Sequence, residues 1–116
     1  MKFKYVLCLG LFLSQVTMSA GMTEYQYEVK ARQVYDLLNR TQKDLSDALD
    51  QRAPNAVILT KTCTYASNLR YLEKVSLENL RLKKAQEDAD FMRQLIVMFD
   101  QSFADLSTTY ERACKR

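Results

Sequence analysis

Three cysteines and the complete absence of histidine define the chemistry open to this chain of 116 residues. Beyond Cys8 near the start, the thiols are Cys63 and Cys114, and no C-x-x-C motif joins them. Without histidine there is no base for a Ser-His-Asp triad and no imidazole ligand for zinc. A nucleophilic cysteine would also need an activating base, and none is evident. We therefore expect that this protein is not an enzyme and has no catalytic residues.

Carboxylates and thioethers offer the other donor atoms. Asp44, Asp47 and Asp50 are three residues apart, a spacing typical of the solvated outer face of a helix, and a slim bundle offers no pocket for acid–base work. Met92, Met98 and the cysteines could serve as soft-metal ligands. Met92 fits a core better, and a disulfide would remove the thiolates. We expect no metal site and no cofactor.

The segment 1–20 has the layout of a secretory signal peptide. Lys2 and Lys4 precede an apolar run of about a dozen residues, which is followed by the small residues Thr17, Ser19, Ala20 and Gly21. A membrane-spanning helix needs roughly 20 apolar residues, so the short run favours a signal peptide, with an uncleaved N-terminal anchor as the alternative. The sequence predicts a periplasmic or secreted protein whose membrane contact is at most peripheral.

Removal of this segment changes the charge of the chain. Residues 21–116 carry 15 basic and 14 acidic side chains, a net charge of +1 against +3 for the full chain. Nucleic-acid binding requires a concentrated basic face, and an exported chain with this balance is not expected to bind nucleic acid.

Residues 21–116 are expected to form a single all-α domain. No glycine follows Gly21 and Pro54 is the only proline, so the chain has few breakers other than one turn near 52–55. We predict an elongated antiparallel three-helix bundle with helices at about 23–52, 54–86 and 89–114. The apolar stripes run through Tyr27, Ala31, Val34, Leu38, Leu45, Ala48 and Leu49, through Leu59, Cys63, Ala66, Leu69 and Leu72, and through Ala89, Met92, Ile96, Phe99, Phe103, Leu106, Tyr110 and Ala113.

The cysteine pair predicts where the second turn lies. An even pair of cysteines in an exported protein favours a disulfide, with an intermolecular bridge or two free thiols as the alternatives. Along one continuous helix Cys63 and Cys114 would be roughly 75 Å apart, so the chain must reverse between them. In a simple hairpin the partners are equidistant from the turn, which places it near 88 or 89, with Asp88 or Asp90 as a cap.

Charge alternates along the predicted helices. The net charge is −1 over residues 21–52, +4 over 53–84 and −2 over 85–116, which favours a basic helix packed between two acidic ones. The alternative is a basic face for an acidic partner or anionic lipid. That face would contain Arg70, Lys74, Arg81, Lys83 and Lys84.

The start of the third predicted helix is more apolar than a core requires. Phe91, Leu95 and Met98 form a stripe at helical spacing, rotated away from the main one. Either this helix is the central one and both stripes are buried, or the second stripe is exposed and docks a partner. Tyr25, Tyr65 and Tyr71 lie off the main stripes and would extend such a surface.

These features predict action through surfaces. In architecture alone, the chain resembles small accessory proteins of bacterial envelope machines, such as secretion or conjugation systems, and small periplasmic inhibitors and immunity proteins. We expect an adaptor, inhibitor or accessory subunit whose partner is another envelope protein or a second copy. The alternatives are a bundle that binds a small apolar ligand or soft metal, and a self-assembling structural coiled coil.

Overall fold

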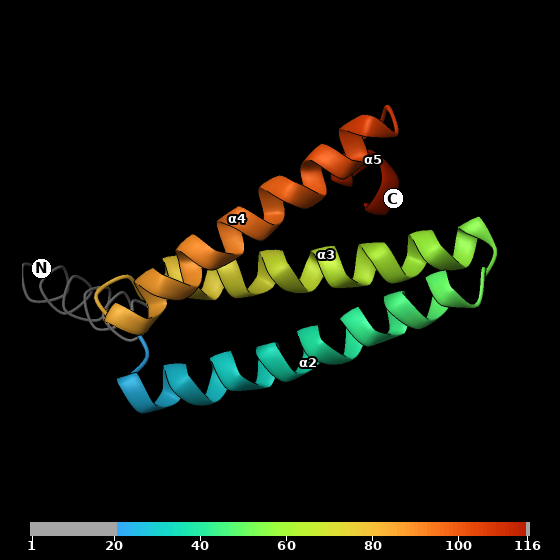
Figure 1. Cartoon of the computed structure of the whole chain (residues 1–116). Helices are drawn as coiled ribbons and strands as arrows, with labels where there is room; N and C mark the ends of the chain where they lie inside the picture. Colours follow the sequence, from blue (N-terminus) through green and yellow to red (C-terminus); the bar gives the residue numbers. More distant parts are fainter. Residues whose placement is uncertain (1–20, 116) are drawn as a thin grey trace, which may run out of the picture.

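The described part of the chain is all-α. A computed structural model describes residues 21–115; the predicted signal peptide at 1–20 lies outside these residues. Three long antiparallel helices pack together and a short helix follows them, over an extent of 67 × 30 × 19 Å (Figure 1). The predicted elongated three-helix bundle is confirmed. The helices are α2 (Glu24–Asp50), α3 (Asn55–Leu77), α4 (Lys83–Asp105) and α5 (Tyr110–Cys114).

Helix α2 follows its prediction closely. The Thr23 hydroxyl accepts a hydrogen bond from the Gln26 backbone N–H at 3.1 Å, and the Gln26 side chain accepts one from Thr23 at 3.0 Å. This capping box pairs two N–H groups that a helix start leaves open. The helix ends at Asp50, because Arg52 adopts a left-handed φ of 55° just before Pro54. The buried stripe is Tyr27, Ala31, Val34, Leu38, Thr41 and Ala48.

Helix α3 is the central helix of the bundle. It packs against α2, α4 and α5, and Leu69 and Leu72 on it are fully buried. The basic segment therefore lies between the two acidic ones, as the charge pattern predicted. The reading in which the helix carrying Phe91 is the central, most buried one is wrong.

The second turn lies earlier than the cysteine argument placed it. Helix α3 ends at Leu77 rather than in the mid-80s, and α4 already begins at Lys83. The side chain of Asn79, which is buried, donates to the Val75 carbonyl at 2.8 Å and accepts from the Met22 backbone N–H at 2.8 Å. Asn79 thus satisfies groups at the helix end and ties the start of the described chain to the turn.

The predicted third helix is broken into two. Helix α4 stops at Asp105, and Ser107 adopts a left-handed φ of 61°. The Thr109 side chain then accepts a hydrogen bond from the Arg112 backbone N–H at 3.2 Å and caps α5. Leu106, expected in the core stripe, is consequently 76% exposed. The apolar spacing in the sequence nevertheless continues across this break, because Tyr110, at the next position of the pattern, is also buried, although it lies on α5.

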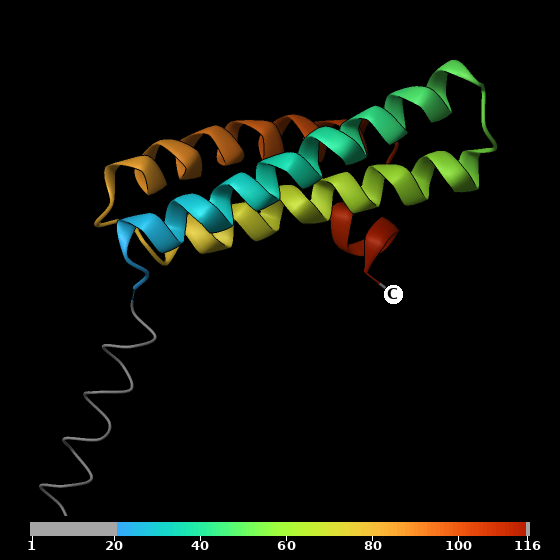
Figure 2. The same ribbon diagram turned by 90° about the horizontal axis from the view of Figure 1, so that it is seen from below.

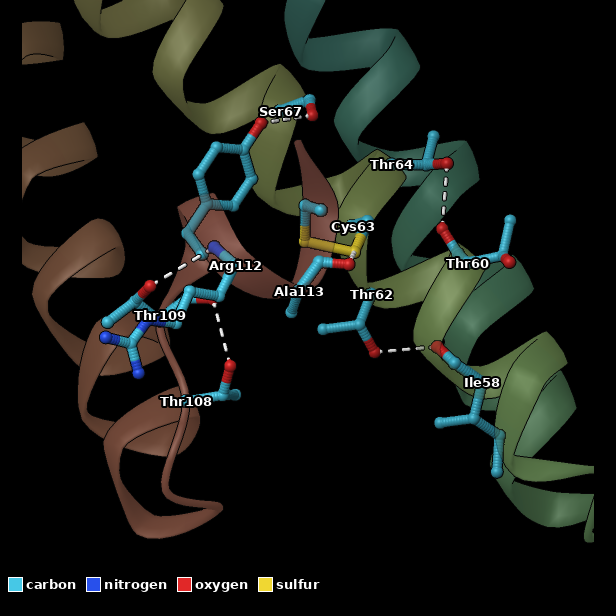
Figure 3. The surroundings of a disulfide bond; sticks show 12 residues. Ile58, Thr60, Thr62, Cys63, Thr64, Ser67, Thr108, Thr109, Arg112 and Ala113 are labelled. Carbon is cyan, nitrogen blue, oxygen red and sulfur yellow. Dashed lines mark hydrogen bonds between the residues drawn. A yellow bond between two sulfur atoms is a disulfide. The ribbon is translucent and has the colours of Figure 1, made fainter. Parts of the chain in front are cut away.

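The predicted disulfide between Cys63 and Cys114 is present, with 5.4 Å between the Cα atoms. It joins α3 to α5, which lies against α3 below the three long helices in Figure 2. Figure 3 shows the sulfur–sulfur bond beside Ala113, whose carbonyl lies 3.8 Å from the Cys63 sulfur. The chain reverses twice between the cysteines, once at 78–82 and once at 106–109. Equidistance from a single turn therefore gave the wrong position.

Candidate functional site

The apolar stripe of Phe91, Leu95 and Met98 lies on α4 and is split between surface and core. Phe91 is 48% exposed and Met98 is 63% exposed. Leu95 is half-buried and packs against the main core cluster. Two of the three side chains are therefore available to a partner, while the third also stabilises the bundle. A helix backbone carries all three, so their spacing is fixed in the free protein.

The five residues of the predicted basic face do not form one continuous face. Arg70 and Lys74 lie on α3, Arg81 lies in the turn, and Lys83 and Lys84 begin α4. Arg81 donates to the Met22 carbonyl. Of the five, Lys74 and Lys83 are exposed and have no side-chain hydrogen bond or ion pair assigned.

Arg70 and Lys84 are both engaged within the chain. The Arg70 guanidinium pairs with Asp100 at 2.6 Å and stacks on the Tyr110 ring with its centre 3.9 Å away. Lys84 lies 3.3 Å from the buried Asp88 carboxylate. The Arg70 contacts join α3 to α4 and α5, whereas the Lys84 pair lies within α4. Both leave less free positive charge than the sequence suggests.

The three tyrosines expected to extend the interaction surface divide in the same way. Tyr25 and Tyr71 are exposed, on α2 and α3 respectively. Tyr65 is buried, and its ring lies 5.1 Å from the ring of Phe99. Tyr65 is therefore a core residue, and its inclusion in the surface was wrong. The aromatic spacing on α3 does not distinguish a residue that faces α4 from one that faces solvent.

An apolar groove of about 230 Å³ opens near the α2–α3 turn, and sequence reasoning missed it. Figure 1 shows α4 diverging from α2 toward this end of the molecule. Side chains that would close a tight bundle are left uncovered: Leu49, for example, is 54% exposed. In the sequence, the residues that line the groove look like ordinary core or surface positions of a helix. They are Leu45, Leu49, Ile58, Thr62, Phe99, Ser102, Phe103 and Leu106.

The opposite end of the bundle is closed by a buried polar cluster around Asp88. This carboxylate is 2% exposed and accepts hydrogen bonds from the hydroxyls of Tyr27 at 2.8 Å and Tyr35 at 2.7 Å. The Tyr27 hydroxyl also lies 3.0 Å from the Ser76 hydroxyl. The carboxylate thus joins α4 to α2 directly, and the Tyr27–Ser76 contact extends the cluster to α3. Asp88 had been expected to cap a helix, and its mid-helix position on α4 overturns that role.

Burial raises the pKa of Tyr27 and of Tyr35 above that of a free phenol, and the hydrogen bonds to Asp88 raise both further. Both hydroxyls therefore stay protonated and donate to Asp88. Tyr27 and Asp88 are buried, whereas Tyr35 borders an open surface hollow that Glu28, Ala31, Arg32 and Lys84 also line. The arrangement of the cluster suits a structural anchor.

Within residues 21–115, no group of three or more His, Cys, Asp or Glu side chains is placed to hold a metal ion. Both thiols of that range are consumed by the disulfide. In the same range, none of the helices combines the length and the apolar character that crossing a bilayer requires. The chain matches no protein-family model, no curated protein and no solved structure.

Proposed function

We propose that this is an exported, non-enzymatic protein that acts in the periplasm or outside the cell by binding a protein partner, either another envelope protein or a second copy of itself. An adaptor, an inhibitor or immunity protein, or an accessory subunit of an envelope machine would act in this way. The exposure of Phe91 and Met98 on a rigid helix is the observation that carries the proposal. Exposed methionine and aromatic side chains that are fixed in position are typical of docking surfaces.

The disulfide supports the proposed location in the periplasm or outside the cell. Disulfides persist in oxidising environments, and Cys63–Cys114 would be reduced in a cytosol of ordinary redox poise. The signal-peptide layout of residues 1–20 points in the same direction.

Affinity capture from the envelope fraction of the source tests the proposal. The Phe91→Asp and Met98→Asp variants should lose the captured protein while they keep the helix content of the parent. Val57→Asp is the matched control, because Val57 is also an exposed apolar residue, in the first turn of α3. Equal capture by all variants would refute the proposal. Leu95→Asp is a poor probe, since Leu95 packs on the core.

A second candidate function is the binding of a small apolar group in the groove lined by Leu45, Phe99 and Leu106. Its volume is below the range of about 300–1,000 Å³ typical of drug-sized sites, so it suits a short alkyl or a single aromatic group. A rise in melting temperature with such compounds, abolished by Ser102→Phe, would favour this candidate. An unchanged melting temperature across the panel would count against it.

A further inference from the structure

Helix α4 carries a second stripe at heptad spacing, which we call the outer stripe. Its members alternate steps of three and four residues, as the core stripe does, but lie across the helix from it. Each of them is exposed. They are Lys84, Glu87, Phe91, Gln94, Met98, Gln101 and Asp105.

The position of α4 leaves this stripe accessible. Helix α4 forms one edge of the bundle in Figure 1, with α3 on its inner side, and α5 lies against α3. The outer stripe shares Phe91 and Met98 with the stripe of the proposed function. The inference below therefore rests on that function and specifies its partner.

The charges of the outer stripe are self-complementary only in an antiparallel arrangement. When two copies of α4 pair antiparallel about Gln94, Lys84 faces Asp105 of the second copy and Glu87 faces Gln101. Parallel pairing would instead oppose Lys84 to Lys84, Glu87 to Glu87 and Asp105 to Asp105. Like charges opposed in this way are unfavourable, so the charge pattern selects one orientation.

The apolar members fall into register in that same orientation. Phe91 of each copy faces Met98 of the other, and the two Gln94 side chains meet at the twofold axis. A twofold interface contains each contact twice, so two aromatic–thioether layers flank a central amide pair. The outermost layers are the two Lys84–Asp105 pairs, which can form because the Lys84 side chain remains 52% exposed beside its contact with Asp88 of the same chain. Every layer of the stripe is thus filled without a buried like-charge pair.

We propose that the outer stripe of α4 binds the same stripe of a second copy of this chain, antiparallel and about a twofold axis. The helix spans about 34 Å at 1.5 Å per residue, and one helix pair buries less than the roughly 800 Å² per partner of a standard interface. The dimer is accordingly weak and forms at micromolar concentrations or above. Such a contact is reversible and depends on the local concentration of the protein.

Substitutions at Gln101 test both the pairing and its orientation. Gln101→Lys places an ammonium opposite Glu87 of the second copy and should tighten the dimer about fivefold, since the new pair occurs twice. Gln101→Glu places a carboxylate there and should weaken it by a similar factor. Parallel pairing predicts weaker association for both variants. Gln101 is exposed, and its side chain donates a hydrogen bond to the exposed Asp105 on the same helix, so we expect neither change to disturb the fold.

Sedimentation velocity of the processed, oxidised chain from about 10 μM to about 1 mM at low ionic strength provides the measurement. The parent should show concentration-dependent dimers, Phe91→Asp should be monomeric throughout, and Val57→Asp should behave like the parent. A monomeric parent at every concentration overturns the proposal. It is equally overturned if Gln101→Lys and Gln101→Glu shift the affinity in the same direction.

Capture with Gln101→Glu separates this inference from the proposed function. If the partner is a second copy, this variant should capture less untagged parent chain than Gln101→Lys does, and no other protein through Phe91. If a different protein is captured equally by both variants and lost with Phe91→Asp, the proposed function stands and self-pairing fails. Melting curves and circular dichroism of each variant show that it is folded.

Discussion

The two ends of the bundle are held together by different means. At the closed end, near the 78–82 turn, Asp88 on α4 binds Tyr27 and Tyr35 on α2, and the Tyr27 hydroxyl also contacts Ser76 on α3. At the open end, near the 51–54 turn, α2 and α4 diverge around the groove, and the fixed connection is the Cys63–Cys114 bond between α3 and α5. A polar cluster closes one end, whereas a covalent bond holds the other without closing it.

This difference shows why apolar surface remains exposed at the open end. The disulfide attaches α5 to α3, and Tyr110 on α5 reinforces the attachment by contacting Ser67 at 2.6 Å. Neither contact draws α4 toward α2, so Leu49 and Leu106 keep most of their exposure. The buried hydrogen bonds of Asp88, in contrast, reach α2 directly from α4. The two anchors can be removed separately.

Loss of the disulfide is expected to have the largest effect. The Cys63→Ala/Cys114→Ala double variant should lose about 4 kcal/mol of unfolding free energy, because the bond closes a long loop in the unfolded chain. Helix α5, with five residues, is too short to persist alone, so its amides should exchange rapidly. Denaturant titration and hydrogen exchange provide the measurements.

In that double variant, backbone amides around Asp88 should still exchange only through global unfolding. Their hydrogen-exchange protection should therefore match the remaining unfolding free energy of the variant. Equal loss of protection at both ends would mean that the two anchors are not independent. Reduction of the parent chain should reproduce the behaviour of the double variant.

Removal of the buried carboxylate is expected to cost somewhat less. Asp88→Ala leaves the Tyr35 hydroxyl without its partner and opens a cavity, for a loss of about 3 kcal/mol in unfolding free energy. Asp88→Asn keeps the shape and one acceptor oxygen, and should cost about 1 kcal/mol. Asp90→Ala, an exposed neighbour on the same helix, is the control and should change stability by less than about 0.5 kcal/mol. If Asp88→Ala resembled this control, the closed end would depend on apolar packing alone.

The smallest expected effect is a loss of unfolding free energy that appears only in alkaline solution. The raised pKa values of Tyr27 and Tyr35 mean that the folded chain keeps phenol protons that the unfolded chain loses above its ordinary pKa of 10.0. The stabilisation is complete below that pH and declines as the pH rises, so the unfolding free energy should fall above about pH 10. Denaturant midpoints measured against pH test this.

Substitution of single tyrosines tests whether the fall in unfolding free energy at alkaline pH comes from the closed end of the bundle. Tyr35→Phe should make the dependence on pH shallower, whereas Tyr25→Phe, an exposed control, should leave it unchanged. Burial also raises the pKa of Tyr65, and Tyr65→Phe should have an intermediate effect. An unchanged slope in Tyr35→Phe would contradict the assignment.

Much of the fold follows from the sequence, because helix periodicity and breakers are local signals. The Thr23 start, the stripe through Tyr27 and Leu38, and the turn at Pro54 were all predictable. The break at Ser107 was not, since no glycine or proline marks it and the apolar spacing resumes at Tyr110. The disulfide partners were predictable from the number of cysteines and the export that the layout of residues 1–20 predicts. The position of the turn was not, because the chain reverses twice between Cys63 and Cys114, and only the first reversal carries a polar signal.

The candidate site was predictable only in part. The second stripe of α4 was visible at Phe91 and Met98, but its exposure depends on which helix is central. The groove could not be predicted, because Leu49 and Phe103 carry the same signal whether the helices meet or diverge. Asp88 reads as a solvated or capping residue until α2 brings Tyr27 and Tyr35 to it. In each case the missing information is the placement of one helix relative to another.

The disulfide also divides the molecule into a covalent ring and a tail. The bond between residues separated by 51 positions closes a ring that contains α4, the following turn and most of α3. While the ring is intact, α4 cannot be exchanged between copies of the chain, because both of its ends are tied to the same α3. Helix α2 is outside the ring and is joined to it only through residues 51–54. It is therefore the one long helix of the described chain that can swap into a neighbouring copy without a change of redox state.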